Sequence, residues 1–278
     1  MSTEPVPLYG GERSRRVTIH DLQQAKDRGE RWPMLTSYDM YSAEIFDEAG
    51  IPVLLVGDSA GNNVLAHPDT VPVSVDELIP LARAVVRSTT KALVVGDLPF
   101  GSYQLGPEQG LATTIRFMKE AGVQAVKLEG GLPVVPTVEK IVSAGVPVMA
   151  HVGFTPQSVN ALGGYRVQGR GDDAARVLGA AKALEDAGAF AVVLEMVTAD
   201  LAREVTEALR IPTIGIGAGP HCDAQVLVWQ DMAGLRGGRL PRFVKTYADL
   251  RGALLSATRD FASDVIEGSF PTADHSYN

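Results

Sequence analysis

Acidic side chains follow two short apolar segments of the chain, each directly after a glycine. Asp58 follows residues 53–57, and Asp97 follows residues 93–96. Short apolar runs of this kind predict strands that are buried on both faces, and parallel strands bring their carboxyl ends to one rim. Two carboxylates together with a chelating substrate suit Mg²⁺. Each Asp could instead cap the helix that follows it, but the repeated Gly-Asp pattern favours the metal.

Two opposite charges lie two residues apart in the predicted strand 125–128. Lys127 and Glu129 therefore project to one face, together with Ala125. Unpaired charges are costly in a dry core, so we expect a substrate anion at Lys127 and a metal or water at Glu129. A buried salt bridge, or a strand end exposed to solvent, would also explain the pair.

Two further apolar segments end in groups that can carry protons. Glu195 follows residues 191–194 and His151 follows residues 148–150. A carboxylate at the end of an apolar strand is partly shielded from water, which favours a general base, although an ion pair at the rim is the alternative. His151 is either a structural or a functional group, and the sequence leaves this open. The glycine-rich stretch 215–219 fits an anion site less well than a tight turn, and it lacks the spacing of a dinucleotide fingerprint.

The same joint recurs between these segments: a helical stretch ends in Ala-Gly and an apolar strand follows. Strands are predicted at residues 33–37, 52–56, 92–95, 125–128, 146–150, 191–194, 212–216 and 225–229. Helices are predicted at residues 18–26, 41–49, 76–88, 108–121, 134–144, 173–187, 200–209 and 247–265. About eight such units predict an α/β protein with a closed (β/α)8 TIM barrel, built as a single domain with an N-terminal helix. We expect an N-terminal arm at 1–16, the barrel at 17–266 and a tail at 267–278.

Composition excludes several classes of protein. The net charge of -8 over 278 residues argues against a nucleic-acid or anionic-membrane surface. No apolar stretch approaches the roughly 20 residues that span a bilayer. The N-terminus lacks a signal-peptide pattern. The single cysteine, Cys222, excludes an internal disulfide. We therefore expect a cytoplasmic enzyme that acts on small molecules and has no nucleic-acid or membrane partner.

The segments just described contain motifs that occur in one known family in the same order. They are Val56-Gly57-Asp58-Ser59, Val95-Gly96-Asp97-Leu98-Pro99-Phe100, Val126-Lys127-Leu128-Glu129-Gly130-Gly131, Ala150-His151-Val152-Gly153-Phe154-Thr155-Pro156-Gln157, Gly163-Gly164-Tyr165 and Ile214-Gly215-Ile216-Gly217-Ala218-Gly219. Each motif alone is weak, but the ordered set is specific. From about residue 18 to residue 265 the chain resembles the ketopantoate hydroxymethyltransferases.

The resemblance implies a reaction. A hydroxymethyl group passes from 5,10-methylenetetrahydrofolate to 3-methyl-2-oxobutanoate, giving 2-dehydropantoate for pantothenate synthesis through a Mg²⁺-stabilised enolate. The resemblance also implies a homo-oligomer, a decamer in many members. By motif position the metal ligands are Asp58, Asp97 and Glu129, the proton acceptor is Glu195, and the substrate-binding residues are Asp58, Ser59, Asp97, Lys127 and His151.

Three rival functions fit parts of this pattern. Another Mg²⁺-dependent barrel enzyme acting on 2-oxo acids, such as a lyase or aldolase of the phosphoenolpyruvate-mutase type, would use the same acidic residues but no folate. A catalytically inactive scaffolding barrel is expected to have lost Asp58, Asp97 or Glu195, and all three are present. A nicotinamide-dependent dehydrogenase would need an early glycine fingerprint, which is missing.

Overall fold

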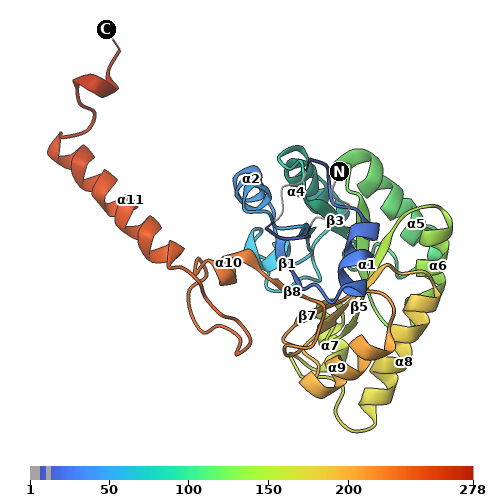
Figure 1. Ribbon diagram of the computed structural model, residues 1–278. Coiled ribbons are helices and arrows are strands. Elements are labelled where there is room, and N and C mark those ends of the chain that lie inside the picture. The colour runs from blue at the N-terminus through green and yellow to red at the C-terminus, as the bar shows by residue number, and fades with distance from the viewer. Residues whose placement is uncertain (1–6, 11–13, 278) are drawn as a thin grey trace. The chain divides into compact units, whose positions relative to one another are not determined.

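The computed structural model describes residues 7–10 and 14–277 (Figure 1). Eight parallel strands, hydrogen-bonded in chain order, close into a barrel. The strands are β1 (Trp32–Thr36), β2 (Val53–Val56), β3 (Leu93–Asp97), β4 (Ala125–Glu129), β5 (Val148–Gly153), β6 (Ala191–Glu195), β7 (Thr213–Ile216) and β8 (Ala224–Leu227). The predicted (β/α)8 barrel is confirmed, as is the leading helix α1 (Ile19–Asp27).

The helices alternate with the strands. They are α2 (Met40–Glu48), α3 (Ala60–Asn63), α4 (Val75–Arg87), α5 (Pro107–Arg116), α6 (Val135–Ser143), α7 (Val159–Leu162), α8 (Asp173–Asp186), α9 (Ala199–Ala208), α10 (Trp229–Met232) and α11 (Leu250–Glu267). Helical segments of other types are the π-helical η1 (Phe117–Ala121) and the 3₁₀ turns η2 (Leu132–Val134), η3 (Pro156–Ser158) and η4 (Ala273–His275). Within residues 7–10 and 14–277, none of these helices combines the length and apolar character needed to cross a bilayer.

Local sequence signals set several helix boundaries. A capping box begins α1, where Thr18 and Asp21 satisfy each other's backbone N–H groups. Ser74 and Glu77 form the same box at the start of α4. The last predicted helix, 247–265, corresponds to α11, which begins at Leu250. It begins there because the Asp249 side chain accepts a hydrogen bond from the Gly252 backbone N–H and so forms the N-cap.

The barrel interior is filled by alternate residues of the strands. Val53 and Leu55 of β2, for example, join one buried apolar cluster with Leu93 and Val95 of β3. Leu22, Ala25 and Val17 from the α1 region belong to the same cluster. Val17 also donates a backbone hydrogen bond to Lys91, just before β3 begins, so the α1 region covers the N-terminal ends of the strands. This leaves the carboxyl ends of the strands as the open end of the barrel.

Two strands and two connecting segments also differ from the prediction. β8 ends at Leu227, and Trp229 of the predicted strand 225–229 begins α10. β5 begins at Val148 and continues to Gly153, so His151 lies within the strand and is held by its pairing with β4 and β6. Residues 57–75 and 151–172, in which no helix was predicted, contain the short helices α3 and α7. Helix α8 then starts where it was predicted, at Asp173.

The chain divides into two compact units, 1–228 and 229–278, and all eight strands belong to the first. The second unit contains α10 and α11, and no residue of α11 is buried. The predicted limits at 16/17 and 266/267 stay predictions. Residues 1–6 and 11–13 of the predicted arm lie outside the described residues, as does residue 278 of the tail.

Candidate active site

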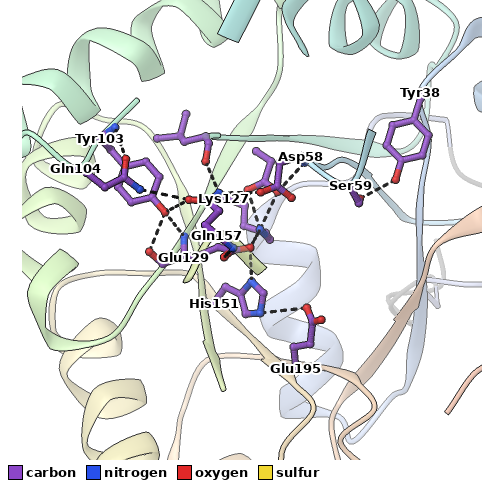
Figure 2. A network of polar contacts seen from close by, with 12 residues as sticks. Tyr38, Asp58, Ser59, Tyr103, Gln104, Lys127, Glu129, His151, Gln157 and Glu195 are labelled. Atoms are coloured by element: carbon purple, nitrogen blue, oxygen red, sulfur yellow. Dashed lines mark hydrogen bonds and ion pairs between the residues drawn. The ribbon is translucent and has the colours of Figure 1, made fainter. Parts of the chain in front are cut away.

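Five charged or titratable side chains continue the inward-facing rows of the barrel beyond its apolar layers. They are Asp97 at the end of β3, Lys127 and Glu129 in β4, His151 in β5 and Glu195 at the end of β6. Figure 2 labels Lys127, Glu129, His151 and Glu195 among them. The parallel register places Asp97 beside Lys127 and Glu129 beside His151. The structure therefore brings together, from four consecutive strands, five of the residues predicted from the sequence.

Asp58 lies against the same group. It follows β2 by two residues, and its backbone N–H donates to Asp97 Oδ2 at 3.1 Å. Lys127 Nζ lies 2.7 Å from Oδ1 and 2.8 Å from Oδ2 of Asp97. Asp58, Asp97 and Lys127 are only 3%, 1% and 3% exposed. Two carboxylates and one ammonium group are thus packed together, away from bulk water.

A second row of contacts runs through His151. Its Nδ1 lies 3.4 Å from Glu129 Oε1, and its Nε2 lies 3.4 Å from Glu195 Oε2. These are ion-pair distances rather than well-aligned hydrogen bonds. Glu129 also lies 3.7 Å from Lys127 Nζ. His151 therefore connects the carboxylate beside Lys127 with the more exposed carboxylate at the end of β6.

Ser59, the remaining predicted residue, follows Asp58 directly. Its hydroxyl shares a 2.8 Å hydrogen bond with the phenol of Tyr38. Figure 2 shows this pair to one side of the other labelled residues. Tyr38 is buried, and burial raises the pKa of its phenol, so Tyr38 stays neutral at physiological pH.

Burial and mutual repulsion set the charges of the cluster. Burial, followed by the charges of Asp97 and Glu129, raises the pKa of Asp58 well above its usual value. Burial also raises the pKa of Asp97, although Lys127 opposes this effect. Burial acts to lower the pKa of Lys127, but the surrounding carboxylates outweigh it and raise that pKa. Asp58 therefore holds a proton more readily than an ordinary carboxyl group, because burial and its acidic neighbours disfavour its charged form.

The pKa values of the two remaining groups, Glu129 and His151, shift in opposite directions. Burial opposes the charged form of both Glu129 and His151. The charge of His151, helped by Lys127, nevertheless lowers the pKa of Glu129, and Glu129 raises the pKa of His151 to about 9. In the protein alone, His151 therefore carries a proton at neutral pH and pairs with Glu129.

The donor set can be compared with what Mg²⁺ requires. Among residues 7–10 and 14–277, no three His, Cys, Asp or Glu side chains form a ready-made metal-ligand group. Mg²⁺ usually binds through one or two carboxylates and takes its other oxygen ligands from substrate and water. Asp58 and Asp97 supply such a pair, and the repulsion that raises the pKa of Asp58 is relieved by a nearby cation. The residues present therefore fit Mg²⁺ when a chelating substrate completes its coordination.

Two uncharged residues belong to the site but were not predicted as site residues. Tyr103, in the loop after β3, and Gln157, in η3 after β5, are both buried and hydrogen-bonded to each other. In the sequence, Gln157 is the last residue of the motif 150–157. A neutral amide in a turn after a strand carries no spacing signal, so its contacts emerge only when the four strand-end loops are brought together.

A pocket of about 500 Å³ opens beside the cluster. Its walls come from the loops after β3, β4 and β5 and from the first half of α8. Glu129, Gln157 and Tyr103 of the site line it, together with Leu132, Arg176 and Val177. The site is therefore continuous with a cavity that is large enough for part of a second molecule.

A closed parallel barrel with a buried cluster of acids and bases at the carboxyl ends of its strands defines a TIM-barrel enzyme. Comparison with known families shows to which enzyme family the chain belongs. The model of the family described as ketopantoate hydroxymethyltransferase matches residues 16–273, and the chain belongs to this family. The protein is therefore a hydroxymethyltransferase, as the sequence motifs predicted.

Relatives of known name agree. The 3-methyl-2-oxobutanoate hydroxymethyltransferase of Acidothermus cellulolyticus is 66% identical over 263 residues, which cover 95% of this chain and 97% of that protein. The enzyme of the same name from Thermobifida fusca is 62% identical over 278 residues, covering 99% of both chains. The enzyme of that name from Saccharopolyspora erythraea is 64% identical over 271 residues, 98% of this chain and 92% of the relative.

Solved structures show the same fold at much lower identity. A phosphonopyruvate hydrolase in complex with oxalate and Mg²⁺ is 14% identical, with a TM-score of 0.58 and coverage of 93% of each chain. The phosphoenolpyruvate phosphomutase of Streptomyces platensis subsp. rosaceus is 15% identical, with a TM-score of 0.60 and coverage of 94% of this chain and 92% of that chain. At these identities the likeness extends to the fold alone.

Proposed function

We propose that this enzyme transfers a hydroxymethyl group to 3-methyl-2-oxobutanoate, giving 2-dehydropantoate for pantothenate synthesis. The names of relatives at 62–66% identity support this substrate. The observation that carries the chemistry is the contact between Asp58 and Asp97 beside Lys127 at the open end of the barrel. A site for a small anionic keto acid needs both an ammonium group and oxygen ligands for a cation, and this cluster contains both.

The keto acid is held by charge and by hydrogen bonds. Asp58 and Asp97 are the proposed metal ligands and Glu129 is a further carboxylate of the metal site. The chemistry that a bound Mg²⁺ supplies is polarisation of the 2-oxo group, which acidifies the neighbouring C3–H. Lys127, which Asp97 orients, offsets negative charge on the substrate. Ser59 lies next to Asp58 in the chain and is the proposed hydrogen-bond partner of the substrate.

Glu195 is the proposed proton acceptor. Its side chain is 16% exposed, whereas Glu129 is 2% exposed, so Glu195 is the carboxylate that an entering substrate reaches more easily. His151 holds Glu195 from one side through the 3.4 Å contact and lines the substrate site. Removal of the C3 proton by Glu195 gives the nucleophile that attacks the one-carbon unit, and a positioned base of this kind typically contributes about 10²–10⁴-fold in rate.

5,10-Methylenetetrahydrofolate is the proposed one-carbon donor: its methylene carbon bonds to C3 of the keto acid, one water supplies the hydroxyl oxygen, and tetrahydrofolate leaves. The pocket beside Glu129 and Gln157 supports a two-substrate reaction, because it offers space next to the keto-acid site for part of a second molecule. Its apolar wall at Leu132 and Val177 suits an aromatic group, and Arg176 suits an anionic one.

Self-association and location also belong to the proposal. Helix α11 exposes Leu254, Phe261 and Ile266, and apolar side chains repeated along one helix are typical of a surface that another chain covers. We propose a homo-oligomer, a decamer on the family resemblance. The single cysteine, Cys222, is free and buried, as is usual for a protein of the reducing cytoplasm.

The rival function is a lyase or aldolase of the phosphoenolpyruvate-mutase type. The phosphoenolpyruvate phosphomutase described above shares the fold at 15% identity, against 62–66% for the hydroxymethyltransferases. The deciding experiment incubates purified protein and 3-methyl-2-oxobutanoate with and without methylenetetrahydrofolate and Mg²⁺, and measures 2-dehydropantoate by mass spectrometry. We expect product only when all components are present. Cleavage of a 2-oxo acid without folate, and no 2-dehydropantoate, would support the rival.

A further inference from the structure

Gln157 forms several hydrogen bonds within the candidate active site, although the proposed reaction assigns it no role. It lies in η3, is 6% exposed, and uses both ends of its side-chain amide. Nε2 donates to Asp58 Oδ2 at 2.9 Å and to the backbone carbonyl of Leu98 at 3.0 Å. Oε1 accepts from the Tyr103 hydroxyl at 2.6 Å. The backbone N–H of Gln157 donates to Glu129 Oε2 at 3.0 Å (Figure 2).

These partners fix the orientation of the amide. If its oxygen and nitrogen were exchanged, the amide oxygen would face the backbone carbonyl oxygen of Leu98, which has no hydrogen to donate. The amide therefore has one orientation, with its two N–H bonds directed at Asp58 and Leu98. A buried side chain with all its hydrogen bonds satisfied is held rigidly and holds its partners in turn.

The contacts of Gln157 join four consecutive strand ends. Asp58 follows β2, Leu98 follows β3, Glu129 ends β4 and Gln157 itself follows β5. No covalent or ladder contact joins β2 to β5 directly, because they are not neighbours in the barrel. Gln157, which follows β5, therefore reaches across the rim of the barrel to Asp58, which follows β2.

The consequence concerns Asp58. Gln157 occupies Oδ2, and among the described residues no recorded hydrogen bond reaches Oδ1. We infer that Gln157 is a positioning residue that holds Asp58 by Oδ2 and so keeps Oδ1 available as the metal ligand. This inference rests on the proposed role of Asp58 at a Mg²⁺ site. It adds a residue that acts on the cation through Asp58, without touching the cation itself.

A direct measurement of cation binding tests the inference. Mn²⁺ replaces Mg²⁺ as the probe, and its free concentration is followed by electron paramagnetic resonance in the presence of saturating 3-methyl-2-oxobutanoate. The variant Gln157→Met keeps the length of the side chain and removes its hydrogen bonds. We expect the Kd for Mn²⁺ to rise by about 10–100-fold, the usual cost of losing a partner that orients a metal ligand. The Mg²⁺ concentration needed for half-maximal activity should rise in parallel.

Gln124→Met is the matched control. Gln124 also joins neighbouring strands, since its side chain accepts from Val94 N–H and donates to the Gly122 carbonyl, but it precedes β4 at the other end of the barrel. It should lower stability without changing the Kd for Mn²⁺. Tyr103→Phe is a second test, because it removes one hydrogen bond from Gln157 and conserves the ring. It should raise the Kd by a smaller factor.

The outcomes separate the two proposals. If wild-type protein binds Mn²⁺ and Asp58→Asn does not, but folded Gln157→Met binds as the wild type does, the positioning role is overturned and the metal site stands. If the wild-type protein does not bind Mn²⁺ at all, both are overturned. If Gln157→Met does not fold, Tyr103→Phe decides, and an unchanged Kd in that variant overturns the positioning role.

Discussion

Lys127 and Asp97 face each other across two neighbouring strands, and the ammonium nitrogen lies within 2.8 Å of both carboxylate oxygens. Both side chains are almost completely buried. Desolvation of each charge is costly, and the pair offsets this cost only while both partners are present. The ion pair is thus both a structural element of the barrel and the anchor of the proposed anion site.

The first prediction follows from removing one partner. Lys127→Met leaves Asp97 and Asp58 buried without their cation, so we expect the free energy of unfolding to fall by about 3–5 kcal/mol. Activity should be lost as well, because the substrate loses the ammonium partner proposed for it. Urea denaturation and the 2-dehydropantoate assay measure the two effects. The exposed Lys182→Met serves as control and should change neither. A Lys127→Met variant as stable as the wild type would contradict this account of the pair.

The second prediction concerns Gly153, the last residue of β5. Its φ is +96°, and a Cβ added there would lie 2.3 Å from the carbonyl oxygen of Glu195. Gly145 has a similar φ of +90°, but a Cβ added there meets no atom within 4 Å. Gly145→Ala should therefore lower the free energy of unfolding by about 1–2 kcal/mol, through backbone strain alone. Gly153→Ala should lower it by more, because the clash adds to the strain.

The extra cost at Gly153 has a functional consequence. The clash displaces the backbone of Glu195, so the kcat of Gly153→Ala should fall well below that of Gly145→Ala. Thermal unfolding and steady-state kinetics of both variants provide the comparison. Equal losses of stability in the two variants would show that the close approach to Glu195 is unimportant.

The third prediction is a pH dependence of stability at Asp47, in α2. Its buried carboxylate accepts hydrogen bonds from the backbone N–H groups of Thr90, Lys91 and Ala92. Burial acts to raise the pKa of Asp47, but these bonds outweigh it and lower the pKa. The stabilisation is therefore fully present above the unfolded-state pKa of about 3.9 and is lost as the pH falls through the folded-state pKa.

Asp47→Asn should therefore lower the free energy of unfolding at pH 7 by about 1–3 kcal/mol. The difference from wild type should shrink as the pH falls from about 4 through the folded-state pKa of Asp47, because below that pKa both chains are uncharged at this position. Urea denaturation at several pH values measures it. Glu48→Gln, at the exposed neighbouring position of α2, is the control and should show no such trend.

Much of the fold could be predicted from the sequence because its signals are local. The Ala-Gly joints and the apolar runs predict the order of strands and helices, and the alternation within β4 places Lys127 and Glu129 on one face. Their position beyond apolar layers follows from the same alternation. What the sequence cannot give is the register between strands. The pairing of Glu129 with His151 depends on which residues of β4 and β5 lie side by side.

Other parts of the site depend on contacts that no local pattern encodes. Gln157 and Tyr103 meet because the loops after β5 and β3 fold over the same rim, although 54 residues separate them. The prediction for His151 was open because a lone histidine at a strand end has many possible partners. Once the strands close into a barrel, its neighbours on both sides are carboxylates, Glu129 and Glu195.

The fourth prediction tests the central claim, that Glu195 takes the C3 proton of a keto acid held at the carboxyl end of the barrel. Wild-type protein and Glu195→Gln are incubated in deuterated water with 3-methyl-2-oxobutanoate and Mg²⁺, without folate, and loss of the C3–H signal is followed by NMR. The variant should bind Mn²⁺ and substrate as the wild type does, which Mn²⁺ titration checks. We expect exchange in the wild type and a rate at least about 10²-fold lower in the variant. Exchange at the wild-type rate in Glu195→Gln would contradict the account.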